Sequence, residues 1–252
     1  MAIGYLEQEG MMEDIPYAIV DSGWIGTIQQ SLQRLVQTKQ IEKRLMGYYF
    51  GLYEIPKAAE QEKYRAYYFM TKRQIRRKVK FSNCLFETIC SSENGMTLGY
   101  VEQEEMYQAL ESTKKNPNKV LLKKNEKILL DYLNYYLVER KEDSVNISEA
   151  ILSKLMGNPK WFEVELFGNW LFCDDVLELQ MQTVAANLSD EEIKNQRFLN
   201  KWLILCGIKK GKIRESAWIE GSIVKNKKNI KKNLFHAKIY KYFVYMRKAI
   251  KR

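Results

Sequence analysis

The sequence predicts an α/β fold, with a Rossmann-like βαβ N-terminal portion followed by a mainly α-helical C-terminal portion. Residues 17–20 form a short apolar run with β-branched side chains, typical of a strand buried on both faces. Residues 28–38 follow with apolar side chains at helical spacing, Ile28 among them, and Thr27 is placed to cap this helix. Residues 44–53 supply a second apolar run. Strand, helix and strand in this order predict a βαβ unit with parallel strands.

The rest of the chain divides into a short mixed stretch and a long helical stretch. We expect a strand at 65–70, a helix at 81–90 and a strand at 96–101 that follows an Asn-Gly turn. From residue 104 onward, apolar side chains recur at three- and four-residue spacing, which predicts helices. The expected helices are 104–114, 125–140, 148–156, 161–172 and one that begins at Ser189 with acids in its first turn.

A polar segment at 113–124 contains a proline and separates these two patterns. The sequence therefore predicts an α/β portion at 1–112 and a helical portion at 113–252, which ends in a basic, aromatic tail.

Positive charge is concentrated at the C-terminal end of the chain. The formal net charge is +10, yet residues 209–252 hold 15 Lys/Arg and two acids, whereas residues 1–208 hold 26 and 29. The body is thus close to neutral. A basic pI does not by itself make the whole protein a nucleic-acid binder.

Cysteine and histidine usage argues against a metal site and for a reducing compartment. The four cysteines form no C-x-x-C pair, and His236 is the single histidine, so a zinc ligand set is not expected. The N-terminus has no basic and apolar leader, and no apolar run approaches the roughly 20 residues that span a bilayer. We therefore expect a cytoplasmic protein.

The segment from Asp21 to Thr27 is the candidate site. In open α/β sheets, ligands bind where strands end and helices begin, and a helix N-terminus attracts phosphate. Gly23 and Gly26 allow close approach of a ligand, Thr27 adds a hydroxyl, and Trp24 offers a ring for stacking. In the alternative interpretation, the glycines only form a tight turn and Asp21 bonds to nearby amides. The pattern is neither a Walker loop nor G-x-G-x-x-G.

The block Ile19-Val20-Asp21-Ser22-Gly23-Trp24-Ile25-Gly26-Thr27-Ile28-Gln29, followed by Gly47-Tyr48-Tyr49-Phe50-Gly51-Leu52, carries a family resemblance. It resembles the C-terminal region of HAD-superfamily hydrolase-like proteins of bacterial capsule and lipopolysaccharide biosynthesis clusters. Pattern and resemblance together give seven candidate ligand-binding residues. They are Asp21, Ser22, Gly23, Trp24, Gly26, Thr27 and Gln29.

The sequence departs from that family at its catalytic motif. The family's nucleophile lies upstream in an Asp-x-Asp motif, whereas Asp21 is followed here by Ser22 and Gly23. We therefore assign no catalytic residue, and neither Glu87 nor Glu220 has an evident carboxylate partner. The resemblance implies a surface-polysaccharide biosynthesis module that binds a phosphorylated or nucleotide-activated sugar. The alternative is a catalytically inactive scaffold or fragment, whose HAD or glycosyltransferase domain is encoded upstream.

Two basic segments suggest further partners. Residues 72–80 place Arg73, Arg76, Arg77 and Lys80 on one helical face, which suits phosphates or a solvated surface. Residues 229–252 interleave lysines with aromatic side chains, which suits an anionic membrane surface and a peripheral location at the inner membrane. RNA binding and simple docking of this helix on the body are the alternatives.

Overall fold

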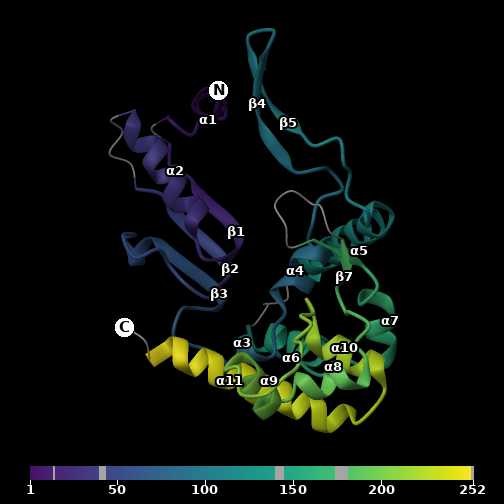
Figure 1. Cartoon of the computed structure of the whole chain (residues 1–252). Coiled ribbons are helices and arrows are strands. Elements are labelled where there is room, and N and C mark those ends of the chain that lie inside the picture. Colours follow the sequence, from purple (N-terminus) through teal and green to yellow (C-terminus); the bar gives the residue numbers. More distant parts are fainter. Residues whose placement is uncertain (14, 40–43, 140–144, 174–180, 251–252) are drawn as a thin grey trace. The chain divides into compact units, whose positions relative to one another are not determined.

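The computed structural model describes the whole chain except residues 14, 40–43, 140–144, 174–180 and 251–252. The chain forms two compact units (Figure 1). Unit 1 comprises Met1–Thr71 and Ser92–Lys123, and unit 2 comprises Lys72–Ser91 and Lys124–Arg252. The sequence-based division at 112/113 differs from these units in two segments, because residues 72–91 belong to unit 2 and residues 113–123 to unit 1.

Unit 1 is built on a parallel three-stranded sheet with the order β1-β2-β3. The strands β1 (Ala18–Trp24) and β2 (Met46–Leu52) are joined through helix α2 (Thr27–Thr38), as the βαβ prediction requires. The strand β3 (Tyr64–Phe69) follows a short 3-10 turn, η1 (Gln61–Lys63). The predicted parallel pairing is thus confirmed.

Only one face of this sheet is covered by α2. On the covered face, Tyr49 and Tyr64 are buried and their rings stack in parallel with centroids 5.9 Å apart. On the other face, Val20 is 84% exposed, and Tyr48 and Tyr67 are nearly half exposed. The prediction that the first strand is buried on both faces is therefore wrong, because Val20 lies exposed on the face opposite α2.

A β-hairpin completes unit 1, and part of it was predicted as helix. The strands β4 (Thr97–Gln103) and β5 (Met106–Glu111) pair antiparallel, and helix α1 (Ala2–Gln8) lies against them. The hairpin turns at Glu104 and Glu105, both with positive φ. The predicted 104–114 helix is therefore wrong, because residues 106–111 form β5. The sequence carries no turn signal here, because such turns usually contain Asn or Gly and this one contains two glutamates. The amide of Gln8 exchanges two hydrogen bonds with the backbone of Tyr107.

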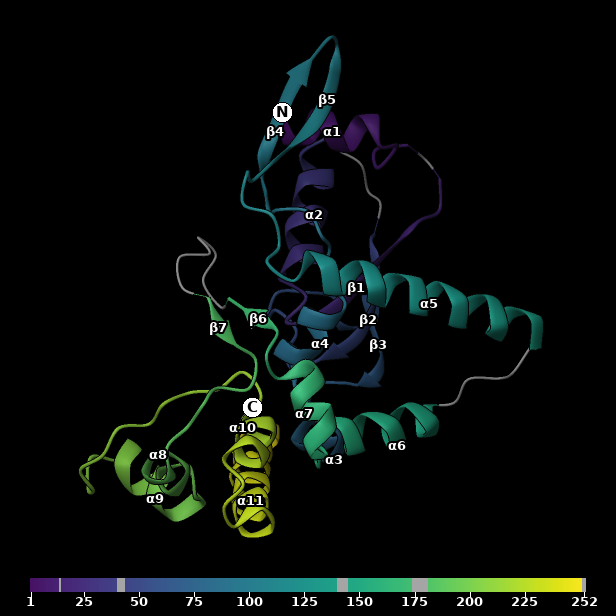
Figure 2. The same ribbon diagram turned by 90° about the vertical axis from the view of Figure 1, so that its right-hand side faces the viewer.

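Unit 2 is mainly helical, as the sequence predicts for this part of the chain (Figure 2). Helix α5 (Lys119–Glu139) begins in unit 1 and continues in unit 2. The other elements are α3 (Ile75–Val79), α4 (Asn83–Ile89), α6 (Val145–Leu155), α7 (Trp161–Phe167), β6 (Leu171–Phe172), β7 (Gln182–Thr183), α8 (Asp190–Asn195), α9 (Phe198–Leu205), α10 (Ile219–Asn226) and α11 (Ile230–Ile250). Ser189 caps α8 in a capping box with Glu192, as expected.

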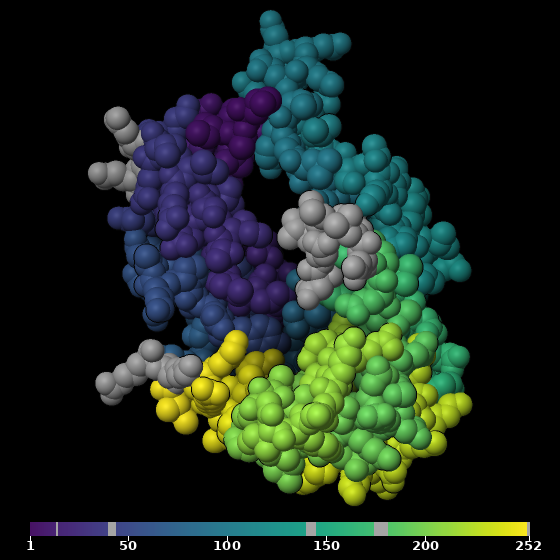
Figure 3. All heavy atoms as spheres, viewed as in Figure 1, coloured from purple at the N-terminus to yellow at the C-terminus, as the bar shows by residue number. Residues whose placement is uncertain are grey.

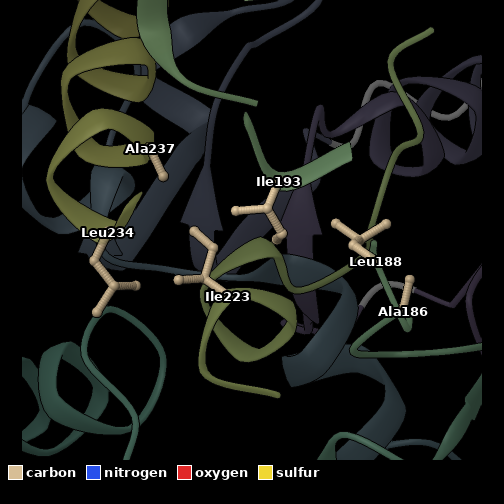
Figure 4. Close-up of a cluster of buried hydrophobic side chains, with 6 residues drawn as sticks. All are labelled: Ala186, Leu188, Ile193, Ile223, Leu234 and Ala237. Atoms are coloured by element: carbon tan, nitrogen blue, oxygen red, sulfur yellow. The ribbon is translucent and has the colours of Figure 1, made fainter. Parts of the chain in front are cut away.

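The core of unit 2 forms where α8, α10 and α11 meet. Figure 4 shows the side chains that gather there, which are Ala186, Leu188, Ile193, Ile223, Leu234 and Ala237. Trp218 is completely buried at the start of α10, and its indole N–H donates to the carbonyl of Met156 at 2.8 Å. That bond ties α10 to the end of α6, 62 residues earlier.

Candidate functional site

Most of the predicted site residues lie in strand β1 and not in a loop. Asp21, Ser22, Gly23 and Trp24 are the last four residues of β1, so they are strand residues and not loop residues. Only Ile25 and Gly26 separate β1 from α2. The strand thus runs almost directly into the helix.

Gly26, rather than Thr27, occupies the N-cap position of α2. Its backbone is left-handed, with a φ of 72°, and Thr27 is the exposed first residue of the helix. A Cβ on Gly26 would lie 2.6 Å from the ring of Tyr64, whose hydroxyl donates to the Gly26 carbonyl at 3.3 Å. The cap prediction is therefore wrong, and the glycine is required by the local backbone and packing.

Gly23 also has a structural reason to be glycine. It pairs with Gly51 on β2, and a Cβ on Gly23 would lie 1.9 Å from the Gly51 carbonyl oxygen. Its φ of 132° is another conformation that side chains disfavour. Gly23 therefore serves the close pairing of β1 with β2, and Gly26 serves the packing of the start of α2 against Tyr64.

The carboxylate of Asp21 is engaged by its own strand. Its Oδ1 atom accepts from the backbone N–H of Gly23 at 3.2 Å and from the hydroxyl of Ser22 at 3.3 Å. Burial raises the pKa of the nearby Tyr49 hydroxyl, and Tyr64 and the Asp21 charge raise it further. These local bonds match the alternative interpretation of Asp21 as a turn-stabilising residue.

Gln29 is a buried residue that connects three elements. Its side-chain nitrogen donates to the carbonyl of Leu45 at 2.8 Å and to that of Lys63 at 3.2 Å. Its side-chain oxygen accepts from the Tyr49 hydroxyl at 2.7 Å. The residue is 2% exposed, whereas Ile28 is 59% exposed, so the predicted inner face of α2 is wrong at its first turn.

Trp24 packs among aromatic side chains at the end of β1. Its ring is stacked on Phe69, with centroids 6.2 Å apart, and tilted against Tyr53 at 5.8 Å. The backbone carbonyl of Trp24 accepts from the N–H of Tyr53 at 2.8 Å. This half-buried tryptophan therefore contributes to the packing between β1 and β3.

A polar cavity of about 210 Å³ lies along the flank of α2, beside these residues. Gln29 and Gln33 line it, and Gln33 accepts a 2.8 Å hydrogen bond from the Leu45 N–H. Within the described part of the chain, Arg34 and Gln37 carry no side-chain hydrogen bond or ion pair. The cavity is lined by Gln29, Gln30, Gln33, Arg34, Gln37, Arg44, Leu45, Ala58, Ala59, Glu60, Lys63 and Tyr64.

Positive charge prevails in this cavity, which we call the α2 cavity. Arg34, Arg44 and Lys63 face one carboxylate, Glu60, which pairs with Arg44 at 2.7 Å. The excess of two positive charges favours an anionic ligand, and the glutamine amides add neutral donors and acceptors. The sequence carried a signal for this site, because Gln29, Gln33 and Gln37 recur at four-residue spacing along one side of the helix.

A second cavity, of about 310 Å³, lies in unit 2 between α4, α10 and α11. Lys241 of α11 lines it and donates to Oε1 of Glu220 at 2.7 Å. Glu220 is fully buried, and its Oε2 atom has no hydrogen-bond partner among the described residues. Glu220, for which the sequence showed no carboxylate partner, is thus paired with a lysine 21 residues later in the chain.

The basic segment at 72–80 does not form one solvated stripe. Arg77 is mostly buried and its guanidinium bonds Glu149 at 2.8 Å, whereas Arg76 is exposed and lies 3.8 Å from the same carboxylate. Lys78 is buried, and burial together with the nearby Lys248 lowers its pKa to about 8. Of the four residues predicted to share one face, Arg73 and Arg76 are exposed, whereas Arg77 and Lys80 are partly buried.

Metal ligands do not converge in the described ranges, where no three histidine, cysteine or carboxylate side chains are placed to hold an ion. In comparisons with known proteins, no family model matches the chain, and no curated protein or solved structure matches it significantly.

Proposed function

We propose that unit 1 is a Rossmann-like binding module for a phosphorylated or nucleotide-activated sugar, and that it serves bacterial capsule or lipopolysaccharide biosynthesis. The ligand lies in the α2 cavity, with Gln29 and Gln33 at its inner wall. One observation carries this proposal, namely the combination of three cations with four glutamine amides around a single cavity. The sequence resemblance supports the biological setting.

The charge of the cavity supports recognition of a phosphate. Arg34 has no side-chain partner within the described chain, so its guanidinium donors are available to a ligand. A guanidinium matches phosphate oxygens with two parallel hydrogen bonds. Lys63, the last residue of η1, adds a second cation, so two positive groups can contact one phosphate without breaking the Arg44–Glu60 pair.

The glutamines support recognition of hydroxyl groups. A primary amide presents both donors and an acceptor, so it bonds a hydroxyl in either direction. Both amide protons of Gln29 are used by the carbonyls of Leu45 and Lys63, and Gln33 is held by the Leu45 N–H, so these two residues shape the wall. The side-chain amides of Gln30 and Gln37, which make no hydrogen bond in the described part of the chain, are the ones that suit a polyhydroxylated ligand.

Calorimetric titration of the full chain with glucose 1-phosphate, UDP-glucose, glucose and inorganic phosphate tests this function. We expect the phosphorylated sugars to bind and free glucose to bind at least about tenfold more weakly, because it lacks the charge-assisted bonds. Replacing Arg34 with Ala removes the unpaired guanidinium. Arg65→Ala is the matched control, because Arg65 is an exposed arginine of the same unit outside the cavity. If none of these four ligands binds, the proposal is refuted for this ligand class.

A catalytically inactive module is the second candidate, and the geometry of Asp21 favours it. Because Oδ1 of Asp21 is bonded to Gly23 and Ser22, this carboxylate stabilises the end of β1. Binding without turnover is then the expected behaviour. Incubation with p-nitrophenyl phosphate, with and without Mg²⁺, measures it. Hydrolysis that is lost in Asp21→Asn but kept in Arg65→Ala would assign a catalytic role to Asp21.

A further inference from the structure

Helix α11 carries apolar side chains on two different faces. Its inner face holds Leu234 and Ala237, which are 5% exposed and pack against Ile193 and Ile223. Its outer face is exposed and is not used by that core. The exposed apolar side chains of the outer face, here called the outer stripe, are Phe235, Tyr242, Phe243, Met246 and Ile250.

The outer stripe is continuous along the helix. Successive members are separated by seven, one, three and four residues, so at 3.6 residues per turn they fall within one side of the helix. Their exposed fractions range from 37% for Tyr242 to 77% for Ile250. An exposed apolar stripe of this kind packs against the apolar surface of a partner molecule or inserts into an apolar medium such as a membrane.

Helix α9 extends the outer stripe sideways. The ring of Phe198 meets that of Phe243 edge-on, with centroids 5.7 Å apart, and the two helices lie side by side (Figure 2). Trp202 and Leu205 follow Phe198 at four and seven residues, on the same side of α9, and are 43% and 60% exposed. Tryptophan beside aliphatic side chains is typical of a membrane–water interface.

Positive charge borders the outer stripe. Helix α11 contains six Lys/Arg and no acid, and part of it is visible at the surface in Figure 3. Lys231, Lys238 and Arg247 each lie four residues from a stripe member, which places them on its edges. Lysine and arginine in such positions lie along an apolar surface and extend their charges to anionic headgroups.

We propose that the outer stripe of α11, together with Trp202 and Leu205 of α9, inserts into the interfacial layer of an anionic lipid bilayer with the helix axis parallel to the membrane. No helix in the described part of the chain is long and apolar enough to cross a bilayer, so the contact is a surface contact. The apolar side chains enter below the headgroups, and the flanking cations bind the headgroup phosphates.

Two other occupants fit the outer stripe less well. A second copy docked through the same stripe would bring two helices of six cations each together, and like charges at an interface disfavour association. Nucleic acid would use the cations and could stack on Phe235 and Tyr242, but Met246 and Ile250 offer it no stacking surface. An anionic bilayer uses both the charge and the aliphatic side chains.

The experiment is flotation of the full chain with phosphatidylcholine vesicles that contain or lack phosphatidylglycerol. The stripe variant is Met246→Ser with Ile250→Ser. Its control is Ile147→Ser with Ile151→Ser on α6, which removes two isoleucines with the same four-residue separation and 52% and 59% exposure. Wild type and control should float with the anionic vesicles only, and the stripe variant should lose roughly tenfold or more of the partitioning, since it loses two inserted side chains.

Three results would overturn the proposal. The first is that wild type does not float with anionic vesicles, or floats equally with neutral ones. The second is equal flotation of the stripe variant and its control. The third is a homodimer, or a complex with polyuridylic acid, that the stripe variant disrupts while flotation stays unchanged. Replacing Lys238 and Arg247 with Gln should also lower flotation and make the remainder less sensitive to salt, because two of the six cations of α11 are lost.

Discussion

The Tyr49 hydroxyl donates a 2.7 Å hydrogen bond to Oε1 of Gln29, and this bond joins the second strand to the first turn of α2. The amide nitrogen of Gln29 reaches the carbonyls of Leu45 and Lys63, where the second and third strands begin. One glutamine thus fixes the helix against two strands. The same helix turn forms the inner wall of the α2 cavity, so fold and proposed binding site share this residue.

Replacing Gln29 with Ala should destabilise unit 1 strongly. It leaves a buried hydroxyl and two backbone carbonyls without their partner, and each unsatisfied buried group costs about 1–3 kcal/mol. We expect a loss of roughly 3 kcal/mol in the free energy of unfolding, measured in urea. Gln37→Ala is the matched control on the same helix, and it should change stability by less than about 0.5 kcal/mol because Gln37 is exposed. Equal stabilities of the two variants would contradict the role assigned to Gln29.

Gly23→Ala should prevent normal packing of β1 on β2. The added methyl group would lie 1.9 Å from the Gly51 carbonyl oxygen, and the backbone at residue 23 has a φ that alanine disfavours. We expect a destabilisation of at least about 2 kcal/mol by thermal unfolding. Gly99→Ala is the control, because a Cβ on this strand glycine has no neighbour within 4 Å. Equal stabilities of the Gly23→Ala and Gly99→Ala proteins would contradict the close approach of β1 to β2 at Gly23.

Stability should rise with pH between about 8 and 10 because of Lys78. Burial, together with the charge of Lys248, lowers its pKa from 10.5 to about 8. The unfolded chain therefore holds a proton on Lys78 across a pH range in which the folded chain has released it, so raising the pH favours folding. The complete effect is roughly 3 kcal/mol.

Urea unfolding at several pH values from 7.5 to 9.5, roughly the window between the two lysine pKa values, measures this slope. Lys78→Met should flatten it relative to wild type, whereas Lys124→Met, a change at an exposed lysine, should not. Stopping below pH 10 avoids the tyrosines, because the raised pKa of Tyr49 makes stability fall once the unfolded tyrosine ionises. Identical slopes for wild type and Lys78→Met would show that Lys78 is not the group responsible.

The pair formed by Glu220 and Lys241 should depend on both members. Lys241→Met leaves a fully buried carboxylate without its cation, and breaking a buried pair in this way costs about 3–5 kcal/mol. Changing both residues, as Glu220→Leu with Lys241→Met, removes the buried charge and should recover a large part of that loss. Guanidinium unfolding of the two single variants and the double variant measures the coupling. Additive effects would mean that the two residues do not act as a pair.

The sequence predicted the order of the elements from β1 to β3 because apolar runs and helical spacing report burial directly. The predicted first strand ends at residue 20, whereas β1 continues to Trp24. The prediction stopped early because Asp21 to Trp24 include residues that usually form turns but here have extended backbone. It also missed the hairpin at Glu104 and Glu105, where ordinary charged residues adopt a conformation that usually marks glycine or asparagine. Local composition cannot show such a turn.

Of the seven predicted site residues, only Gln29 lines the α2 cavity, and four of the others are strand residues of β1. The glycines and Asp21 have structural roles that depend on contacts with Gly51, Tyr64 and Tyr49, and no spacing rule reveals those contacts. Arg34, Arg44 and Lys63 were not predicted, because they come from three separate segments of the chain that only the fold brings together.

The most direct test of the central claim compares the affinity for UDP-glucose of Arg34→Ala with that of Thr27→Ala, by calorimetric titration of the full chain. Arg34 lines the α2 cavity, whereas Thr27 is the exposed first residue of the same helix and lies outside the cavity lining. We predict that Arg34→Ala weakens binding by at least about tenfold, as expected for a lost charge-assisted contact, and that Thr27→Ala binds like wild type. Unchanged affinity in Arg34→Ala with a loss in Thr27→Ala would contradict the account and place the ligand at the end of β1.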